Sequence, residues 1–307
     1  MADQLDMRDL RYFETIAETG HVGRAARLVF RSQPALTGAV RRLEQALGTA
    51  LFQRAGRGIR LTAAGEALVI RARALRMASE DAVREIGDLG KGLAGQVRIG
   101  TVPTAARFLL PPACAEFLRQ APGVTLKTVI GHNDVLAASL KSGELDLVVG
   151  FSGEADAAIT SHEILTDEVV VVAARSHPVF RRRARMRDLL QYRWILAGPS
   201  GATRQWLDHA FQTRGLPGPT VQIETNLILL LPPLIEQNNL LSFISRRHID
   251  RRGRLKEIPL RETTMKRRFA VSYRKESYLS PAARRFAELL RTQGKSLFQG
   301  IDRIAAC

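Results

Sequence analysis

Residues 22–48 read VGRAARLVFRSQPALTGAVRRLEQALG, and this stretch decides the fold of the N-terminal region. Its first seven residues predict a short helix with a face of small side chains, which a second helix can cross closely. Ser32 is a suitable N-cap for that second helix, and Pro34 near its first turn costs no hydrogen bond. Gly48 is a typical helix stop. We therefore expect a helix-turn-helix whose second helix covers residues 33–47.

The two faces of the predicted helix 33–47 differ in character. One face is an apolar stripe with steps of four and three residues: Leu36, Val40, Leu43 and Leu47. The opposite face begins with short side chains and continues with longer, mainly cationic ones: Pro34, Thr37, Gly38, Arg41, Arg42 and Gln45. Short side chains let the start of a helix enter the DNA major groove, where arginines further along reach guanine edges or phosphates.

Charge supports the same interpretation. The chain of 307 residues carries a formal net charge of +16, which favours a polyanionic partner. Eight arginines and a single acidic residue, Glu44, lie between Val22 and Arg60. A solvated basic surface is the alternative explanation for such a stretch, and the helix-turn-helix around it favours DNA instead.

Elements on both sides complete a DNA-binding domain. Leu10, Phe13, Ile16 and Ala17 have helical spacing and predict a first helix that Gly20 ends. Residues 51–62 read LFQRAGRGIRLT and predict a hairpin whose glycine-rich, arginine-bearing tip can lie along a phosphate backbone. We expect the turn, the second helix and the hairpin to supply the DNA contacts: Arg31, Ser32, Gln33, Pro34, Ala35, Thr37, Gly38, Arg41, Arg42, Arg54 and Arg57.

These residues resemble the winged helix-turn-helix of LysR-type transcriptional regulators. The matching positions keep a fixed spacing over some forty residues: Arg24-Ala25-Ala26, Leu28, Ser32-Gln33-Pro34-Ala35-Leu36, Leu43-Glu44, Leu47-Gly48, Leu51-Phe52, Arg54 and Leu61-Thr62-Ala63-Ala64-Gly65. The chain departs from the family at residues 21–23, where a serine-phenylalanine pair is common, and at residues 37–40, where Ser-Arg-Gln-Ile is common. The second departure obscures the operator sequence but not the DNA-binding role.

A long helix follows. Thr62 can cap a helix that extends to about Leu89, with apolar positions at heptad spacing that require a partner: Leu68, Ala72, Leu75, Ala82, Ile86 and Leu89. A helix packed on its own domain is the alternative. The resemblance to LysR-type regulators implies an antiparallel dimer through this helix and a homotetramer built as a dimer of dimers. Glycines at 87, 90, 92 and 95 then predict a hinge.

From Gln96 onward, apolar strands alternate with helices, which predicts parallel α/β sheets. The fold class is therefore α/β, with an all-α winged helix-turn-helix at the N-terminus. We expect residues 1–62 to bind DNA, residues 63–90 to form the linker helix and residues 91–307 to bind an effector. The last region divides into two lobes, about 96–165 with 267–307, and 166–266. Two such lobes resemble a type-2 periplasmic binding protein, the sensor of LysR-type regulators.

Ligands in open α/β sheets bind beyond the carboxyl ends of strands. Those ends offer hydroxyls, amides and helix N-terminal N–H groups, which suit a carboxylate or other anion. We therefore expect a small anionic effector, with Arg204 or His132 as countercharge. Together with the resemblance, this gives the predicted effector-binding residues: Thr101, Pro103, Thr104, His132, Asn133, Phe151, Pro199, Ser200, Thr203, Arg204 and Asn226. The sensor half is also basic. Its basic residues either form a solvated surface or contact bent DNA.

Other classes of protein fit the sequence less well. The two cysteines, Cys114 and Cys307, form no Cys-x-x-Cys pair, and the six histidines show no metal-ligand spacing, so we expect neither a metal site nor a cofactor. Residues 198–202 lack the Gly-x-Ser-x-Gly pattern of a nucleophile elbow, and no acid–base constellation argues for an enzyme. No signal peptide or membrane-length apolar run is visible, which predicts a cytoplasmic protein. A small-molecule binding protein without a sequence-specific DNA role remains the alternative, ahead of an enzyme on the α/β lobes.

Overall fold

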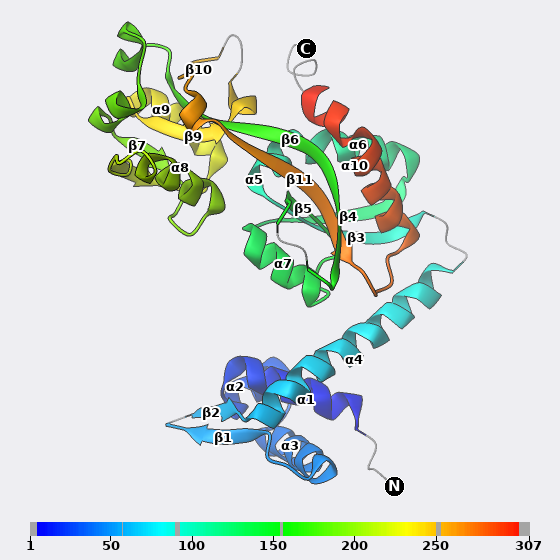
Figure 1. The fold of residues 1–307 in the computed structure, drawn as a ribbon. Coiled ribbons are helices and arrows are strands. Elements are labelled where there is room, and N and C mark those ends of the chain that lie inside the picture. Colours follow the sequence, from blue (N-terminus) through cyan, green and yellow to red (C-terminus); the bar gives the residue numbers. More distant parts are fainter. Residues whose placement is uncertain (1–4, 57, 90–92, 154–155, 250–252, 301–307) are drawn as a thin grey trace. The chain divides into compact units, whose positions relative to one another are not determined.

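A computed structural model describes residues 5–56, 58–89, 93–153, 156–249 and 253–300 (Figure 1). Its contacts divide the chain into two compact units, residues 1–89 and residues 90–307. The fold class predicted from the sequence is confirmed, because a helix-turn-helix precedes an α/β domain.

The first unit contains the predicted helix-turn-helix and hairpin. Its elements follow in chain order: α1 (Met7–Thr19), α2 (Val22–Leu28), α3 (Gln33–Leu47), β1 (Phe52–Ala55), β2 (Gly58–Leu61) and α4 (Ala63–Asp88). The Ser32 side chain accepts from the backbone N–H of Ala35 and caps α3, while Gly48 ends it at a φ of 65°. The Thr62 side chain accepts from the backbone N–H of Gly65 in the same way and starts α4. Local capping chemistry thus sets these boundaries.

The core of the first unit changes the interpretation of the long helix. Leu10, Phe13, Leu43 and Leu51 form a buried cluster that also contains Ala72, and Leu68 packs against it. Ala72 is fully buried within its own chain, so it is not available to a partner helix. Leu68 is partly buried against the same cluster. The first half of α4 contacts α1, which corrects the prediction that the heptad positions face a partner along the whole helix.

The second unit is a single mixed sheet flanked by helices. Its elements are β3 (Ala94–Thr101), α5 (Pro103–Phe108), α6 (Leu110–Gln120), β4 (Gly123–Ile130), α7 (Asn133–Lys141), β5 (Leu147–Phe151), β6 (Ile159–Ala174), β7 (Trp194–Leu196), α8 (Ala202–Gln212), β8 (Val221–Glu224), α9 (Leu231–Asn238), β9 (Leu241–Ser245), β10 (Leu255–Glu257), β11 (Met265–Arg274) and α10 (Pro281–Gly300). The strand order is β4-β3-β5-β11-β6-β9-β7-β8, and β10 pairs with β6.

Two long strands join the lobes of this unit. β6 and β11 pair antiparallel from Val169 opposite Met265 to Ile159 opposite Arg274, and Figure 1 shows them running side by side from one lobe to the other. β11 is also antiparallel to β5, and β6 is antiparallel to β9. The expectation of purely parallel sheets is therefore wrong: parallel pairing is confined to β3 with β4 and β5, and to β7 with β8 and β9.

Each lobe has its own apolar core. Ile99, Phe117 and Phe286 belong to the core of the first lobe, which draws on residues 97–165 and 269–298. Trp194 and Phe211 belong to the core of the second lobe, which lies within residues 169–258. Within the described part of the chain, no helix is both long enough and apolar enough to cross a lipid bilayer.

Gly65 and Gly38 should respond to alanine in opposite directions. A Cβ at Gly65 would overlap the carbonyl oxygen of Leu51 and lie 2.9 Å from Cδ2 of Leu61, so Gly65→Ala should cost about 1–3 kcal/mol of stability. A Cβ at Gly38 meets only Nη1 of Arg42 at 3.5 Å, so Gly38→Ala should stabilise α3 by up to about 1 kcal/mol. Unfolding of the full-length protein followed by far-UV circular dichroism checks both, and equal effects would contradict the packing of α4 on Leu51.

Candidate functional site

The outer face of α3 presents the predicted DNA contacts. Gln33, Pro34, Ala35 and Arg41 are exposed, and Thr37 and Gly38 are half-buried. Because small side chains surround the start of the helix, its backbone can approach another surface closely.

His21 caps the preceding helix, α2, and accepts through Nδ1 from the backbone N–H of Gly23 at 3.0 Å. The imidazole of His21 thus caps α2 at residues 21–23, where LysR-type regulators commonly have a serine-phenylalanine pair.

Arg41 and Arg42 differ although they are neighbours. Arg42 donates from Nε and Nη2 to the two carboxylate oxygens of Asp9, at 2.8 and 2.7 Å, which ties α3 to α1. Its hydrogen bonds to the Asp9 carboxylate raise the pKa of the Arg42 guanidinium. Among the described residues, Arg41 has no hydrogen-bond or ion-pair partner and its side chain is exposed. Arg41 is therefore free to adjust to a DNA partner, whereas Arg42 also holds α3 against α1.

The remaining predicted DNA contacts precede α3 or belong to the segment that follows it. Arg31 donates from Nε to the Tyr12 hydroxyl at 3.3 Å and is exposed. Arg54 is exposed on β1, paired in register with Ile59 on β2. Arg57, also predicted to contact DNA, lies outside the described residues.

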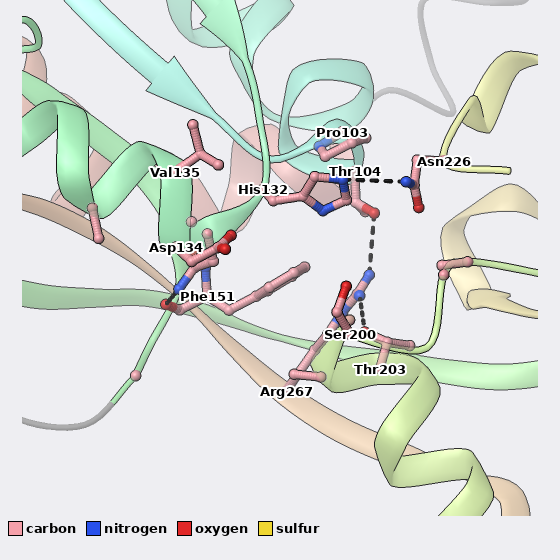
Figure 2. A pocket seen from close by; sticks show the side chains of 18 of the residues that line it. Pro103, Thr104, His132, Asp134, Val135, Phe151, Ser200, Thr203, Asn226 and Arg267 are labelled. Atoms are coloured by element: carbon pink, nitrogen blue, oxygen red, sulfur yellow. Dashed lines mark hydrogen bonds between the residues drawn. The ribbon is translucent and has the colours of Figure 1, made fainter. Parts of the chain in front are cut away.

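A large cleft lies between the lobes of the second unit, with a cavity volume of about 1090 Å³. Nine of the eleven predicted effector residues line it: Pro103, Thr104, His132, Asn133, Phe151, Pro199, Ser200, Thr203 and Asn226. They come from the ends of strands and the starts of helices in both lobes, and Figure 2 shows labelled members of this group around the opening.

Two predicted effector residues lie elsewhere. Thr101 is fully buried, and its hydroxyl donates to the carbonyl oxygen of Val102 at 3.4 Å, so it belongs to the interior of the first lobe. Arg204 donates from Nε to both carboxylate oxygens of Asp208, at 2.9 and 2.8 Å, one turn along α8. That pairing neutralises the guanidinium outside the cleft lining, so Arg204 is not the countercharge predicted from the sequence.

Arg267 on β11 is a cation of the cleft that the sequence did not predict. Its Nε donates to Oδ2 of Asp167 at 2.9 Å, from the directly opposite position on β6. The other oxygen of Asp167 accepts from the Ser245 hydroxyl at 2.7 Å. The side chains of Arg267 and Asp167 are only 10% and 1% exposed. Burial lowers the pKa of Arg267 and the Asp167 carboxylate opposes this shift, so the pair is a buried, hydrogen-bonded ion pair.

Arg267 also contacts both lobes. Nη2 donates to the Thr104 hydroxyl at 3.1 Å on the first lobe, and Nη1 donates to the Thr203 hydroxyl at 3.3 Å on the second, as Figure 2 shows. The guanidinium carbon lies 4.4 Å from the centre of the Phe151 ring. Each threonine oxygen accepts from Arg267, so its own O–H is free to donate to a ligand. This corner of the cleft, which we call the donor corner, comprises Thr104, Thr203, Arg267 and the first N–H groups of α8.

In the part of the chain that the structure describes, no side chain caps the N-terminus of α8, which begins at Ala202. Its free N–H groups and the positive end of the helix dipole therefore add to the donors already in the corner. Every one of these groups donates, and a carboxylate accepts on both oxygens. The donor corner is thus chemically suited to bind an oxyanion.

Other polar residues of the cleft are linked to protein partners. Asn226 of the second lobe lies 3.2 Å from Nε2 of His132 in the first, a hydrogen bond between the lobes (Figure 2). Asn133 accepts from the backbone N–H of Phe151 at 3.0 Å and donates to its carbonyl, so it fixes the Phe151 backbone. His248 also lines the cleft, and burial lowers its pKa to about 4, which keeps the ring neutral at neutral pH.

Removing Arg267 should cost far more stability than removing a surface arginine. Arg267→Met leaves the Asp167 carboxylate buried without its partner, and we expect a loss of about 3–5 kcal/mol. Arg267→Met with Asp167→Asn should recover part of that loss. The control, Arg291→Met, breaks a solvent-exposed pair with Glu288 and should change the stability little. Urea unfolding followed by tryptophan fluorescence tests this, since both tryptophans, Trp194 and Trp206, lie in the second unit; equal losses would contradict the buried pair.

Comparison with known proteins identifies the family of both units. A model described as "LysR substrate binding domain" matches residues 90–295, and one described as "Bacterial regulatory helix-turn-helix protein, lysR family" matches residues 7–66. The HTH-type transcriptional regulator GalR of Pseudomonas putida is 30% identical over 285 residues, which cover 90% of this chain and 71% of GalR. CbbR of Xanthobacter flavus is 28% identical over 303 residues, covering 96% of this chain and 90% of CbbR.

A solved structure shows the same fold along the whole chain. A full-length variant of OxyR from Pseudomonas aeruginosa superposes with a TM-score of 0.64 at 24% identity, covering 96% of each chain. The relatives are transcriptional regulators and not enzymes, in agreement with the expectation from the sequence. Since one family model alone spans more than half of the residues, the chain belongs to the LysR family of bacterial transcriptional regulators.

Proposed function

We propose that this LysR-type regulator reads a specific operator with α3 and its hairpin, and that a small organic acid in the cleft of residues 90–307 controls its action. The observation that carries the effector proposal is the donor corner, in which Arg267 links the two lobes through Thr104 and Thr203. A carboxylate bound there accepts from groups of both lobes at once. Binding therefore favours the arrangement in which the lobes are held together.

DNA binding is assigned to the exposed face of α3. Its small residues at positions 34–38 allow close approach to base edges, and Arg41 supplies a cation without a partner among the described residues. Arg31, just before α3, and Arg54, on the hairpin, suit phosphate contacts, which fix the register of a protein on the duplex without reading sequence. Because bacterial promoter DNA lies in the cytoplasm, we expect the regulator to be a cytoplasmic protein.

Assembly through α4 connects the two functions. From its middle to its C-cap this helix leaves large apolar side chains exposed: Leu75, Val83, Ile86 and Leu89, the last three at least 70% exposed. Their burial against a second copy would form an antiparallel dimer, and two dimers would make the tetramer that the family resemblance implies. A change in the lobes then alters how the dimers sit on DNA, and with that the bend of the operator.

Footprinting of the full-length protein on its own upstream region tests this proposal. We expect a protected site with dyad symmetry that weakens as salt concentration rises, since phosphate contacts release counterions. Arg41→Ala should weaken protection, and should lower the salt slope by about 1 if Arg41 contacts a phosphate. A saturating effector should change the footprint without abolishing it.

Arg11→Ala provides the matched control, because Arg11 is an exposed arginine on α1, outside the proposed interface. Its footprint should equal that of the unsubstituted protein. Absence of a discrete site, or protection that Arg41→Ala leaves unchanged, would contradict sequence reading by α3. The alternative, a small-molecule binding protein without a sequence-specific DNA role, would then explain the cleft better.

A further inference from the structure

The charge of the cleft is opposite to that of the chain. The chain as a whole carries +16, yet the described residues of the cleft lining include four carboxylates and two cationic side chains, a net charge of −2 with histidine counted as neutral. An effector with no feature beyond its carboxylate would meet an excess of negative charge. The lining therefore favours a ligand that carries a positive charge in addition to the carboxylate that the donor corner binds.

Pairing within the protein identifies the carboxylates that remain without a counterion. Lys141 binds Asp156 at 2.5 Å, and Glu163 binds Arg268 at 2.7 Å. The charge of Arg267 is already balanced by the buried carboxylate of Asp167. Among the described residues, two lining carboxylates are left without a hydrogen-bond or ion-pair partner: Asp134 and Glu224.

These two carboxylates come from different lobes. Asp134 lies in the first turn of α7, and Figure 2 shows it on the side of the cleft opposite Ser200 and Thr203. Glu224 ends β8 in the second lobe, and a Cβ at Gly198 would lie 3.1 Å from its Oε1, so this carboxylate lies against the backbone of the loop that leads to α8. Carboxylates of both lobes, without a partner among the described residues, thus line the same cleft as the donor corner.

We propose that the effector is a zwitterion: a carboxylate bound in the donor corner, and a protonated amine that pairs with Asp134, with Glu224 as the second acceptor. This inference rests on the proposed function of the cleft and narrows its ligand class from organic acids to amino acids in the broad sense. A protonated amine donates three hydrogen bonds and supplies the positive charge that the lining lacks. A hydroxyl in the same place donates one hydrogen bond and leaves the charge uncompensated.

Titration of the full-length protein with matched ligands tests the proposal. The panel contains α- and ω-amino acids of roughly three to six carbons, each beside the plain acid and the hydroxy acid of the same skeleton, with tryptophan fluorescence and thermal shift as readouts. At least one amino acid should bind, and about 10- to 100-fold more tightly than its plain-acid partner, as expected for a hydrogen-bonded charge pair. Asp134→Asn should remove most of that preference, and Glu224→Gln a smaller part.

Glu276→Gln is the matched control, since Glu276 is exposed and outside the cleft lining; it should leave the affinities unchanged. The proposal is overturned if plain or hydroxy acids bind as tightly as their amino counterparts, if Asp134→Asn leaves the preference intact, or if no amino acid of the panel binds. In each of these cases the operator footprint of Asp134→Asn still reports on the proposed regulator function independently. An intact footprint separates failure of the ligand class from failure of the function.

Discussion

The ion pair between Arg267 and Asp167 is the interaction on which the second unit depends most. The two residues face each other across β6 and β11, the strands that join the lobes, and both side chains are nearly excluded from solvent. Ser245 satisfies the remaining oxygen of Asp167, while Thr104 and Thr203 accept from Arg267. One buried charge pair therefore fixes the register of two strands and contacts three separate elements around it. Such a pair is costly to break and, by itself, contributes little net stability.

Local chemistry made much of the fold predictable. The capping residues Ser32 and Thr62 and the stop at Gly48 act within a few residues of the helix ends they define, so the sequence locates these ends without knowledge of the tertiary fold. The antiparallel pairing of β6 and β11 could not be predicted in this way. It joins segments about a hundred residues apart, and no local pattern specifies which strand lies beside which.

The candidate site was predictable to the same extent and for the same reason. Strand ends and helix starts are local features, and most residues assigned from them line the cleft. Arg267 was missed because it lies within Lys266-Arg267-Arg268, which in sequence is a solvated basic run. Alternation along β11 turns the middle residue inward and its two neighbours outward. Arg204, predicted as the countercharge, instead pairs with Asp208 one helical turn along α8 and lies outside the cleft lining.

The path of the chain through the second unit sets the order in which it can fold during synthesis. The core of the first lobe combines residues 97–165 with residues 269–298, whereas the core of the second lobe lies between them. The helix-turn-helix unit leaves the ribosome complete, and the second lobe follows while the first lobe still lacks β11 and α10. Until β11 emerges, the edges of β5 and β6 that it will cover keep backbone N–H and C=O groups unpaired. The lobe translated first is thus the last to be finished.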